Sequence, residues 1–431
     1  MIPVRLVTLA PGHFHAALIQ KEMLPGIDPH VTVYSPLDAD LAAHVSRIAA
    51  FNGRALQPTA WKMDVHAGDD WPEHFLRDRP GNVVVLSGRN RPKIDLMRMA
   101  VAAGMHVLAD KPWIIEAEDM PRLAETIAKA KQAGLLLYDV MTERFEITSI
   151  LQRAIVDDPN LFGIIEDGDA ENPGVFMESI HYLKKQVAGA PLRRPGWFFD
   201  ITQEGEGLSD VGTHLVDQVM WMLFTDEPLD HTKDVTMLDA RRWPTALTVE
   251  QFQAITGLGD FPAELHGWLN GDRLEYYCNN QVIYKQRGVH IRLDVLWDYE
   301  APEGGGDTHN AVFRGSRSTA IVRQAGGKSP ELFVVPNPSN REETRDHLSR
   351  QVDSWQGKYP GTRFVAVGDE FHIVIPDIYR TGHEAHFAEV TAQFLKYLEA
   401  PATLPEWEMP HLLAKYFVTT QGVTHSRRDG F

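Results

Sequence analysis

The residues with the clearest chemical potential lie in one predicted helix near the middle of the chain. Asp210 and His214 are four residues apart and Asp217 follows three residues later, so a helix places all three on one face. Histidine can accept a hydroxyl proton near neutral pH, and a neighbouring carboxylate can orient it and favour its protonated form. The spacing favours acid–base chemistry, but an amphipathic helix with one buried, hydrogen-bonded histidine would carry the same residues.

A second candidate is Lys111, in the tripeptide Asp110-Lys111-Pro112. It follows a predicted buried strand, at the carboxyl edge where open parallel sheets bind their ligands. A lysine there can donate to a substrate hydroxyl and stabilise a developing alkoxide. Pro112 would stiffen the turn. Taken alone, the tripeptide fits an ordinary solvated turn as well.

A third feature is the turn Ala10-Pro11-Gly12-His13-Phe14-His15, between the first predicted strand and a helix. In this position, backbone N–H groups can contact the pyrophosphate of a dinucleotide. Only the middle glycine of G-x-G-x-x-G is present, as Gly12, so a tight turn with two packed histidines is the alternative. The second strand ends near Ser35 with no basic residue directly after it, which favours NAD over NADP.

These residues need a scaffold, and the first part of the chain predicts a doubly wound parallel sheet. Apolar runs alternate with amphipathic stretches such as Lys93–Ala103 and Ala117–Ala133. This alternation implies right-handed crossovers between parallel strands. We expect a Rossmann-type dinucleotide-binding domain over residues 1–145. Its predicted strands are Val4–Leu9, Val31–Ser35, Val83–Ser87, His106–Ala109 and Leu135–Val140.

The remainder, residues 146–431, predicts an α+β domain with a mostly antiparallel open sheet for substrate binding and oligomerisation. A helix over roughly 208–223 precedes short alternating segments separated by Gly, Asn and Asp clusters. These segments are Val235–Leu238, Leu274–Tyr277, Val289–Trp297, Ala311–Arg314 and Thr319–Arg323. The stretches Glu384–Leu398 and Met409–Val423 predict helices that pack back on the body.

Composition narrows the class of protein. The net charge of −17 opposes binding to nucleic acid or to an anionic membrane, which would need a basic face. A single cysteine, Cys278, fits a reducing compartment, and no apolar run approaches the roughly 20 residues of a membrane span, so we expect a cytoplasmic protein. Although 19 histidines are present, no H-E-x-x-H or similarly spaced ligand pair occurs, and we expect no metal site.

Taken together, the motifs resemble those of the glucose–fructose oxidoreductase and inositol dehydrogenase superfamily, often written Gfo/Idh/MocA. Its members carry a Gly-rich turn, a Glu-Lys-Pro motif and later a Gly-Gly-Gly…Asp-x-Gly-x-His-x-x-Asp motif. This chain has Asp110-Lys111-Pro112, then Gly205-Glu206-Gly207 and Asp210-Val211-Gly212-Thr213-His214-Leu215-Val216-Asp217, in the same order and spacing. The resemblance covers residues 1 to about 225, and the rest looks like a longer variant of the family's sheet domain.

The resemblance implies roles for these residues. Lys111 would anchor the hydroxyl being oxidised, Asp210 would be its acidic partner, and His214 the general acid/base. The implied cofactor is NAD, with NADP possible, contacted by residues of the turn and of the strand ends: Ala10, Gly12, His13, Phe14, His15, Ser35, Ser87, Gly88, Asn90, Asp110 and Lys111. The departures are Ala10 and His15 for glycines, Asp110 for glutamate, and Glu206 for the middle glycine, from where Glu206 could reach the substrate.

Further polar residues precede the helix motif. An arginine with a tryptophan suits a polyol through charge-assisted hydrogen bonds and stacking on a sugar face. The substrate-binding candidates are Glu178, His181, Arg194, Trp197, Asp210 and His214. The alternative is that Arg193, Arg194 and Asp200 form surface ion pairs. Asp307-Thr308-His309 could contact a ligand or cap a strand.

The expected reaction is hydride transfer between nicotinamide and a ring carbon of a sugar, cyclitol or glycoside. One alternative is redox-neutral cleavage of a glycoside with a retained NAD, for which His181 or Tyr182 would be the added acid/base. Another is a non-catalytic sensor of a sugar or dinucleotide, which need not keep both Lys111 and His214. The family's sheet domain also implies a homo-oligomer.

Overall fold

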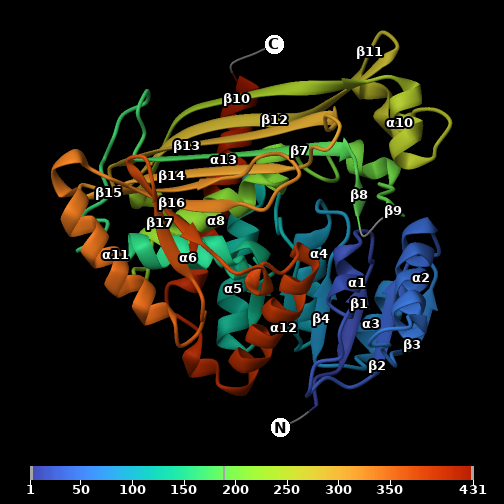
Figure 1. Cartoon of the computed structure of the whole chain (residues 1–431). Coiled ribbons are helices and arrows are strands. Elements are labelled where there is room, and N and C mark those ends of the chain that lie inside the picture. Colours follow the sequence, from blue (N-terminus) through green and yellow to red (C-terminus); the bar gives the residue numbers. More distant parts are fainter. Residues whose placement is uncertain (1–2, 188–189, 429–431) are drawn as a thin grey trace. The chain divides into compact units, whose positions relative to one another are not determined.

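The computed structural model describes residues 3–187 and 190–428, which form two compact units (Figure 1). The first contains the chain up to Thr142 together with Thr202–Gly205 and His383–Met409, and we call it the parallel-sheet unit. The second contains Glu143–Ile201, Glu206–Gly382 and the chain from Pro410, and we call it the large-sheet unit. None of the described helices combines the length and the apolar character that crossing a membrane requires.

The parallel-sheet unit is built on six parallel strands in the order β3-β2-β1-β4-β5-β6, which confirms the predicted doubly wound sheet. Its switch point lies between β1 and β4, where Leu9 pairs with Leu86. The turns that follow these two strands therefore lie side by side, as at ligand-binding crevices of open α/β sheets. The strands are β1 (Leu6–Leu9), β2 (His30–Ser35), β3 (Lys62–Ala67), β4 (Val83–Leu86), β5 (His106–Ala109) and β6 (Leu137–Asp139).

One of these strands, β3, is absent from the sequence-based prediction. It lies at the edge of the sheet, most of its residues are exposed, and its sequence KMDVHA lacks the apolar run of a buried strand. The helices of this unit are α1 (His15–Leu18), α2 (Ala39–Gly53), α3 (Trp71–Asp78), α4 (Lys93–Ala102), α5 (Met120–Gln132) and α12 (His383–Glu399).

The large-sheet unit contains a ten-stranded sheet in which all neighbours are antiparallel except β7 and β13, so the predicted mostly antiparallel sheet is confirmed. The order is β10-β12-β13-β7-β14-β15-β16-β18-β17, and β11 pairs with β12. The strands are β7 (Val175–Lys184), β10 (Val235–Leu247), β11 (Leu269–Asn270), β12 (Arg273–Gln286), β13 (Val289–Glu300), β14 (Thr308–Arg314), β15 (Ser318–Arg323), β16 (Glu331–Pro336), β17 (Arg363–Val367) and β18 (Glu370–Val374).

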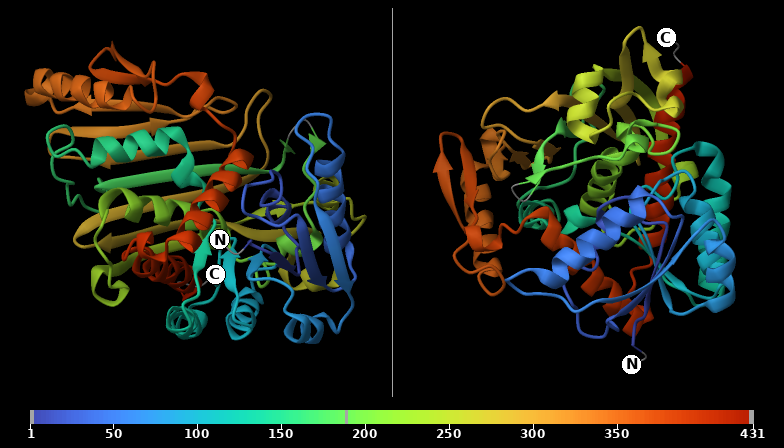
Figure 2. Two further views of the ribbon diagram at one scale, coloured as in Figure 1. Left: turned by 90° about the horizontal axis from the view of Figure 1, so that it is seen from below. Right: turned by 90° about the vertical axis from the view of Figure 1, so that its right-hand side faces the viewer.

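Helices cover one face of this large sheet. The predicted helix over 208–223 forms two consecutive pieces, α7 and α8, which contact β12 and β13. Helix α6 contacts β15 and β16 (Figure 2, left). The covered face carries the alternating buried residues of each strand, for example Leu293 of β13 opposite Met177 of β7. The helices of the unit are α6 (Ile147–Val156), α7 (Gly207–Asp210), α8 (Gly212–Leu223), α9 (His231–Asp234), α10 (Val249–Thr256), α11 (Arg341–Trp355) and α13 (Glu408–Arg428).

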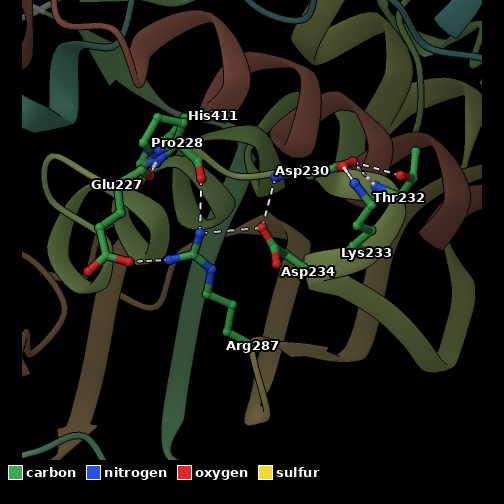
Figure 3. Close-up of polar contacts among 8 residues, drawn as sticks. All are labelled: Glu227, Pro228, Asp230, Thr232, Lys233, Asp234, Arg287 and His411. Atoms are coloured by element: carbon green, nitrogen blue, oxygen red, sulfur yellow. Dashed lines mark hydrogen bonds and ion pairs between the residues drawn. The ribbon is translucent and has the colours of Figure 1, made fainter.

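A polar network fixes the segment between α8 and β10 to the turn between β12 and β13 (Figure 3). Arg287, in that turn, pairs with the carboxylate of Glu227 and donates to the Pro228 carbonyl oxygen at 2.9 Å. Its backbone N–H donates to the carbonyl oxygen of Asp234 at 2.8 Å. His411 of α13 lies 2.9 Å from the carbonyl oxygen of Glu227. The network joins a connecting segment, a strand turn and α13, and so helps to hold α13 on the sheet.

Candidate functional site

The turn after β1, predicted to bind a dinucleotide, packs closely against the loop after β4. Ala10 adopts a φ of 42°, a left-handed conformation that glycine adopts more easily. The N–H groups of Gly12 and His13 donate to the carbonyl oxygen of Ser87 at 3.2 and 3.1 Å. A Cβ atom on Gly88 would lie 2.3 Å from the carbonyl oxygen of Ala10, so only glycine fits there. The two turns are thus packed together at backbone distance.

A pocket of about 390 Å³ opens beside these turns at the carboxyl edge of the parallel sheet. It brings together five of the predicted cofactor residues: Ala10, Gly12, Ser35, Ser87 and Gly88. Its lining adds two carboxylates, Asp38 and Asp40, and the indole of Trp71. Asp38 also accepts the N–H of Leu41 at 2.9 Å and caps α2. The pocket offers an apolar wall and two acidic side chains at the end of β2, the position where a ribose hydroxyl is bound in dinucleotide folds.

Two other predicted cofactor residues, His13 and His15, meet Ser87 at Asp110, just after β5. His15 Nδ1 lies 2.9 Å and His13 Nδ1 3.6 Å from Asp110 Oδ2, to which Ser87 Oγ donates at 2.9 Å. Burial lowers the pKa of His15, more than its contact with Asp110 raises it. Burial alone would raise the pKa of Asp110, but His15, Lys93 and His13 outweigh it and hold the pKa well below its usual value. Phe14 packs its ring against His15 at a centroid distance of 4.5 Å.

The predicted Lys111 is almost fully buried, and its backbone is held by a second lysine that the sequence analysis did not single out. Lys93 donates to the carbonyl oxygens of Asp110 and Pro112, at 2.7 and 2.9 Å, and to Asn90 Oδ1 at 2.6 Å. Asn90, a predicted cofactor contact, also donates to the backbone oxygen of Glu204 at 2.7 Å. Its amide therefore ties the loop after β4 to residues 202–205. In the sequence, the feature that could have pointed to Lys93 is its place as a basic residue at the start of an apolar helix, α4.

In the large-sheet unit, Asp210 and His214 are partly exposed residues at the junction of α7 and α8. The helix can approach β12 because Gly207 has no side chain, since a Cβ there would lie 1.9 Å from the carbonyl oxygen of Cys278. The suggestion that Glu206 could reach a substrate is wrong. Its buried carboxylate accepts hydrogen bonds from Arg242 at 2.8 Å, Arg427 at 2.9 Å and Asn280 at 3.2 Å, and these contacts occupy both oxygens.

Asp217, on the same helix, is a structural residue. Arg144 holds it with two hydrogen bonds, Nε to Oδ2 at 2.6 Å and Nη2 to Oδ1 at 2.7 Å. Lys415 of α13 donates to Oδ1 at 3.0 Å. Burial alone would raise the pKa of Asp217. The charges of Arg144 and Lys415 outweigh this effect, so the pKa is lowered overall. The ion cluster joins α8, α13 and the segment before α6.

The predicted His181 is oriented on the helix-covered face of β7. Ser179 Oγ lies 2.8 Å from His181 Nε2, and Asp307 Oδ2 lies 3.2 Å from His181 Nδ1. Lys185 donates to the same carboxylate oxygen at 2.6 Å. An ionised Asp307 fixes the Nδ1–H tautomer and leaves Nε2 to accept the serine proton. Ser179 and Lys185 were not predicted, because only the fold aligns them with His181.

Aromatic packing completes this group. The indole of Trp297 lies 4.9 Å from the His181 ring, and the Arg194 guanidinium lies over it at 5.1 Å from the ring centroid. Arg194 also covers Phe198, at 4.4 Å, and is buried. Trp197, which follows Arg194 closely in the sequence, is also buried.

Not all predicted substrate residues lie together. Glu178 is three positions from His181 along β7, and so points to the opposite face of the strand. There it contacts Asn310, whose Nδ2 lies 3.3 Å from Glu178 Oε1. The structure therefore separates Glu178 from the His181 group, whereas His309, paired across from Ser179, lies on the side of that group.

Comparisons with known proteins agree with this architecture. A family model described as "Putative oxidoreductase C terminal domain" matches residues 151–427. The crystal structure of "a putative oxidoreductase from Parabacteroides merdae ATCC 43184" is 41% identical, with a TM-score of 0.96, and the match covers 100% of this chain and 98% of that chain.

Two more distant structures share the fold. GenD2 from gentamicin A biosynthesis, in complex with NAD, is 14% identical with a TM-score of 0.57 over 100% of this chain and 96% of that one. KijD10, a 3-ketoreductase from Actinomadura kijaniata in complex with NADP and TDP-benzene, is 13% identical with a TM-score of 0.56 over 96% and 95%.

Proposed function

Because this chain belongs to the oxidoreductase family defined by that C-terminal domain, with the fold of Gfo/Idh/MocA-type enzymes, we propose that it transfers hydride between a nicotinamide dinucleotide and a ring carbon of a sugar, cyclitol or glycoside. The observation that carries this proposal is the pocket at the switch point of the parallel sheet. Its lining includes Lys93, which donates to the carbonyl oxygens on either side of Lys111. GenD2 and KijD10 were crystallised with NAD and NADP respectively, which supports a dinucleotide in this pocket.

The cofactor is proposed to be NAD. Asp38 and Asp40 line the pocket, and the Arg89 guanidinium lies 3.9 Å from the Asp40 carboxylate. A 2′-phosphate would meet these two negative charges, whereas ribose hydroxyls can donate to them. The pyrophosphate would contact the turn around Gly12 and the amides of the loop at Ser87–Gly88.

Three residues are proposed to carry out the reaction. In the oxidation direction His214 accepts the hydroxyl proton, Lys111 stabilises the oxygen as it becomes negative, and Asp210 orients the substrate. The dinucleotide, when bound, accepts the hydride. His181, Trp297 and Arg194 provide a histidine held in one tautomer beside an aromatic surface, a combination suited to a polyol.

The test is to identify both ligands. Purified protein is denatured and the released small molecules are analysed by mass spectrometry, and the native protein is then incubated with NAD or NADP and a panel of sugars, cyclitols and glycosides. We expect dinucleotide binding and reduction of the nicotinamide by at least one polyol class. A protein that binds neither dinucleotide would contradict the proposal.

A second candidate is redox-neutral cleavage of a glycoside, in which the retained NAD is reduced and reoxidised within one turnover. The observation that favours it is the His181 environment, because Ser179 and Asp307 give that histidine a defined tautomer for proton transfer. The two reactions differ in their products. Accumulation of NADH supports the dehydrogenase, whereas release of free sugar without NADH supports cleavage.

A further inference from the structure

The group of His13, His15 and Asp110 combines two imidazoles and a carboxylate, ligand types that bind transition metals. His13 and His15 come from the turn after β1, and Asp110 comes from the end of β5. One potential ligand atom of each residue, an imidazole nitrogen or a carboxylate oxygen, lies within 4.8 Å of those of the other two. Sequence spacing predicted no metal site, because the aspartate is far along the chain and only the parallel sheet brings it to the two histidines.

The distances fit a shared ion. Asp110 Oδ2 lies 2.9 Å from His15 Nδ1 and 3.6 Å from His13 Nδ1. Two ligand atoms bound to one tetrahedral zinc at about 2.0–2.1 Å are separated by about 3.3 Å. A His15–Asp110 hydrogen bond would explain the first distance alone. His13 Nδ1, by contrast, lies beyond hydrogen-bond distance of that oxygen but within reach of a shared ion.

The surroundings of the ligand atoms suit a metal as well. The backbone N–H of His15 lies 3.5 Å from His13 Nδ1, at the limit of a hydrogen bond, and this weak contact would be lost when His13 Nδ1 binds a metal. Ser87 Oγ donates to Asp110 Oδ2 at 2.9 Å and can orient the carboxylate from outside the ligand set.

We propose that His13, His15 and Asp110 form an open binding site for a divalent transition-metal ion of the zinc type. Three protein ligands leave the fourth position of a tetrahedral ion open. Water can reach that position, since the His13 side chain is 19% exposed. His383 of α12 is a further imidazole beside the site, with its ring centroid 5.7 Å from that of His15.

The three proposed metal ligands are also among the predicted cofactor contacts, but none of them lines the 390 Å³ pocket. Binding of an ion and binding of a dinucleotide are therefore measured separately. The Asp38–Asp40 side of the pocket belongs to the end of β2, whereas the ligands follow β1 and β5.

The experiment titrates the full-length, metal-free protein with Co²⁺ and follows the visible absorption of the ion, then displaces it with Zn²⁺. We expect one tetrahedral-type spectrum at one equivalent, and its loss in His13→Ala, which changes the most exposed ligand. The matched control is a double variant, His66→Ala with His74→Ala, which removes the second cluster of possible ligands, His66, His74 and Asp78. This control should keep the spectrum.

Three outcomes are decisive. The metal site is overturned if the wild-type protein gives no Co²⁺ spectrum, or if His13→Ala gives an undiminished one. It is also overturned if the spectrum is lost in the double variant but kept in His13→Ala. Zn²⁺ should also raise the melting temperature of the wild-type protein but not that of His13→Ala, whose folding is checked by circular dichroism. NAD binding is measured in the same samples. Its absence beside an intact Co²⁺ spectrum would contradict the proposed function and leave the metal site standing.

Discussion

Lys93 Nζ lies 2.7 Å from the carbonyl oxygen of Asp110, so one buried lysine holds the backbone on which another, Lys111, is placed. The ammonium group also donates to Pro112 O and Asn90 Oδ1. Burial lowers the pKa of Lys93 to about 8, with Asp110 and Glu204 opposing the shift. Lys93 is thus a positioning residue for the turn after β5.

Replacing Lys93 by methionine should therefore loosen this turn. Three acceptors lose a donor, and we expect a loss of about 2–3 kcal/mol in the free energy of unfolding. Urea denaturation measures the loss, with Lys131→Met, a change of an exposed lysine in α5, as the control. Equal stability of the two variants would show that Lys93 does not support the turn.

The Asp217 cluster predicts a pH-dependent contribution to stability. In Asp217→Asn, Arg144 and Lys415 stay buried without the carboxylate that neutralises them. We therefore expect the free energy of unfolding to fall by about 3–5 kcal/mol at neutral pH. The pKa of Asp217 is lowered in the folded protein, so its contribution is complete above about pH 4 and declines as the pH falls further.

Chemical denaturation at several pH values tests this. The difference between wild type and Asp217→Asn should shrink on acidification, and Asp353→Asn, an exposed change in α11, should show no such difference. A difference that does not vary with pH would mean that the carboxylate charge is not the source of the stability.

His44 predicts acid sensitivity of the parallel-sheet unit. This histidine of α2 is buried, and neither ring nitrogen has a hydrogen-bond partner among the described residues. Burial, aided by Arg47, lowers its pKa to about 4. Between about pH 6.5 and 4 the unfolded chain binds a proton at His44 that the folded chain does not, so stability falls as the pH falls.

His44→Leu removes this proton uptake. Relative to wild type, the variant should gain about 3 kcal/mol of stability between pH 7 and pH 4. His30→Leu, an exposed histidine in β2, is the control and should gain much less. Parallel loss of stability in wild type and His44→Leu over this range would contradict the prediction.

Asp40 should set the cofactor preference. Its carboxylate lines the pocket and faces Arg89 at 3.9 Å. Asp40→Ser removes a charge that repels a 2′-phosphate, and we expect NADP binding to improve about tenfold relative to NAD, which corresponds to about 1.4 kcal/mol. Binding titrations with both dinucleotides measure the ratio. Asp69→Ser, outside the pocket lining, should leave it unchanged.

The sequence predicted the parallel sheet well because its buried strands, such as Val83–Leu86, are apolar runs between helical patterns. It missed β3, whose polar residues reflect an exposed edge. The helix over 208–223 was placed correctly apart from its interruption at Val211. Strand and helix types follow from local patterns, so they were accessible without the structure.

The site was less predictable where it depends on distant residues. Lys93, Ser179 and Trp297 have no local motif and gain their roles only from the fold. Glu206 was misjudged because Arg242 and Arg427, which neutralise it, come from remote elements. The roles of Lys111, Asp210 and His214 stay predictions, supported by order and spacing in the sequence.

The most direct test of the proposed function is the rate of hydride transfer in Lys111→Ala compared with wild type. With saturating dinucleotide and the polyol that reduces NAD in the substrate panel, the variant should transfer hydride about a hundredfold more slowly, as on removal of one stabilising donor at a developing oxyanion. Lys131→Ala is the control and should turn over at the wild-type rate. Full turnover by Lys111→Ala with bound dinucleotide would contradict the account.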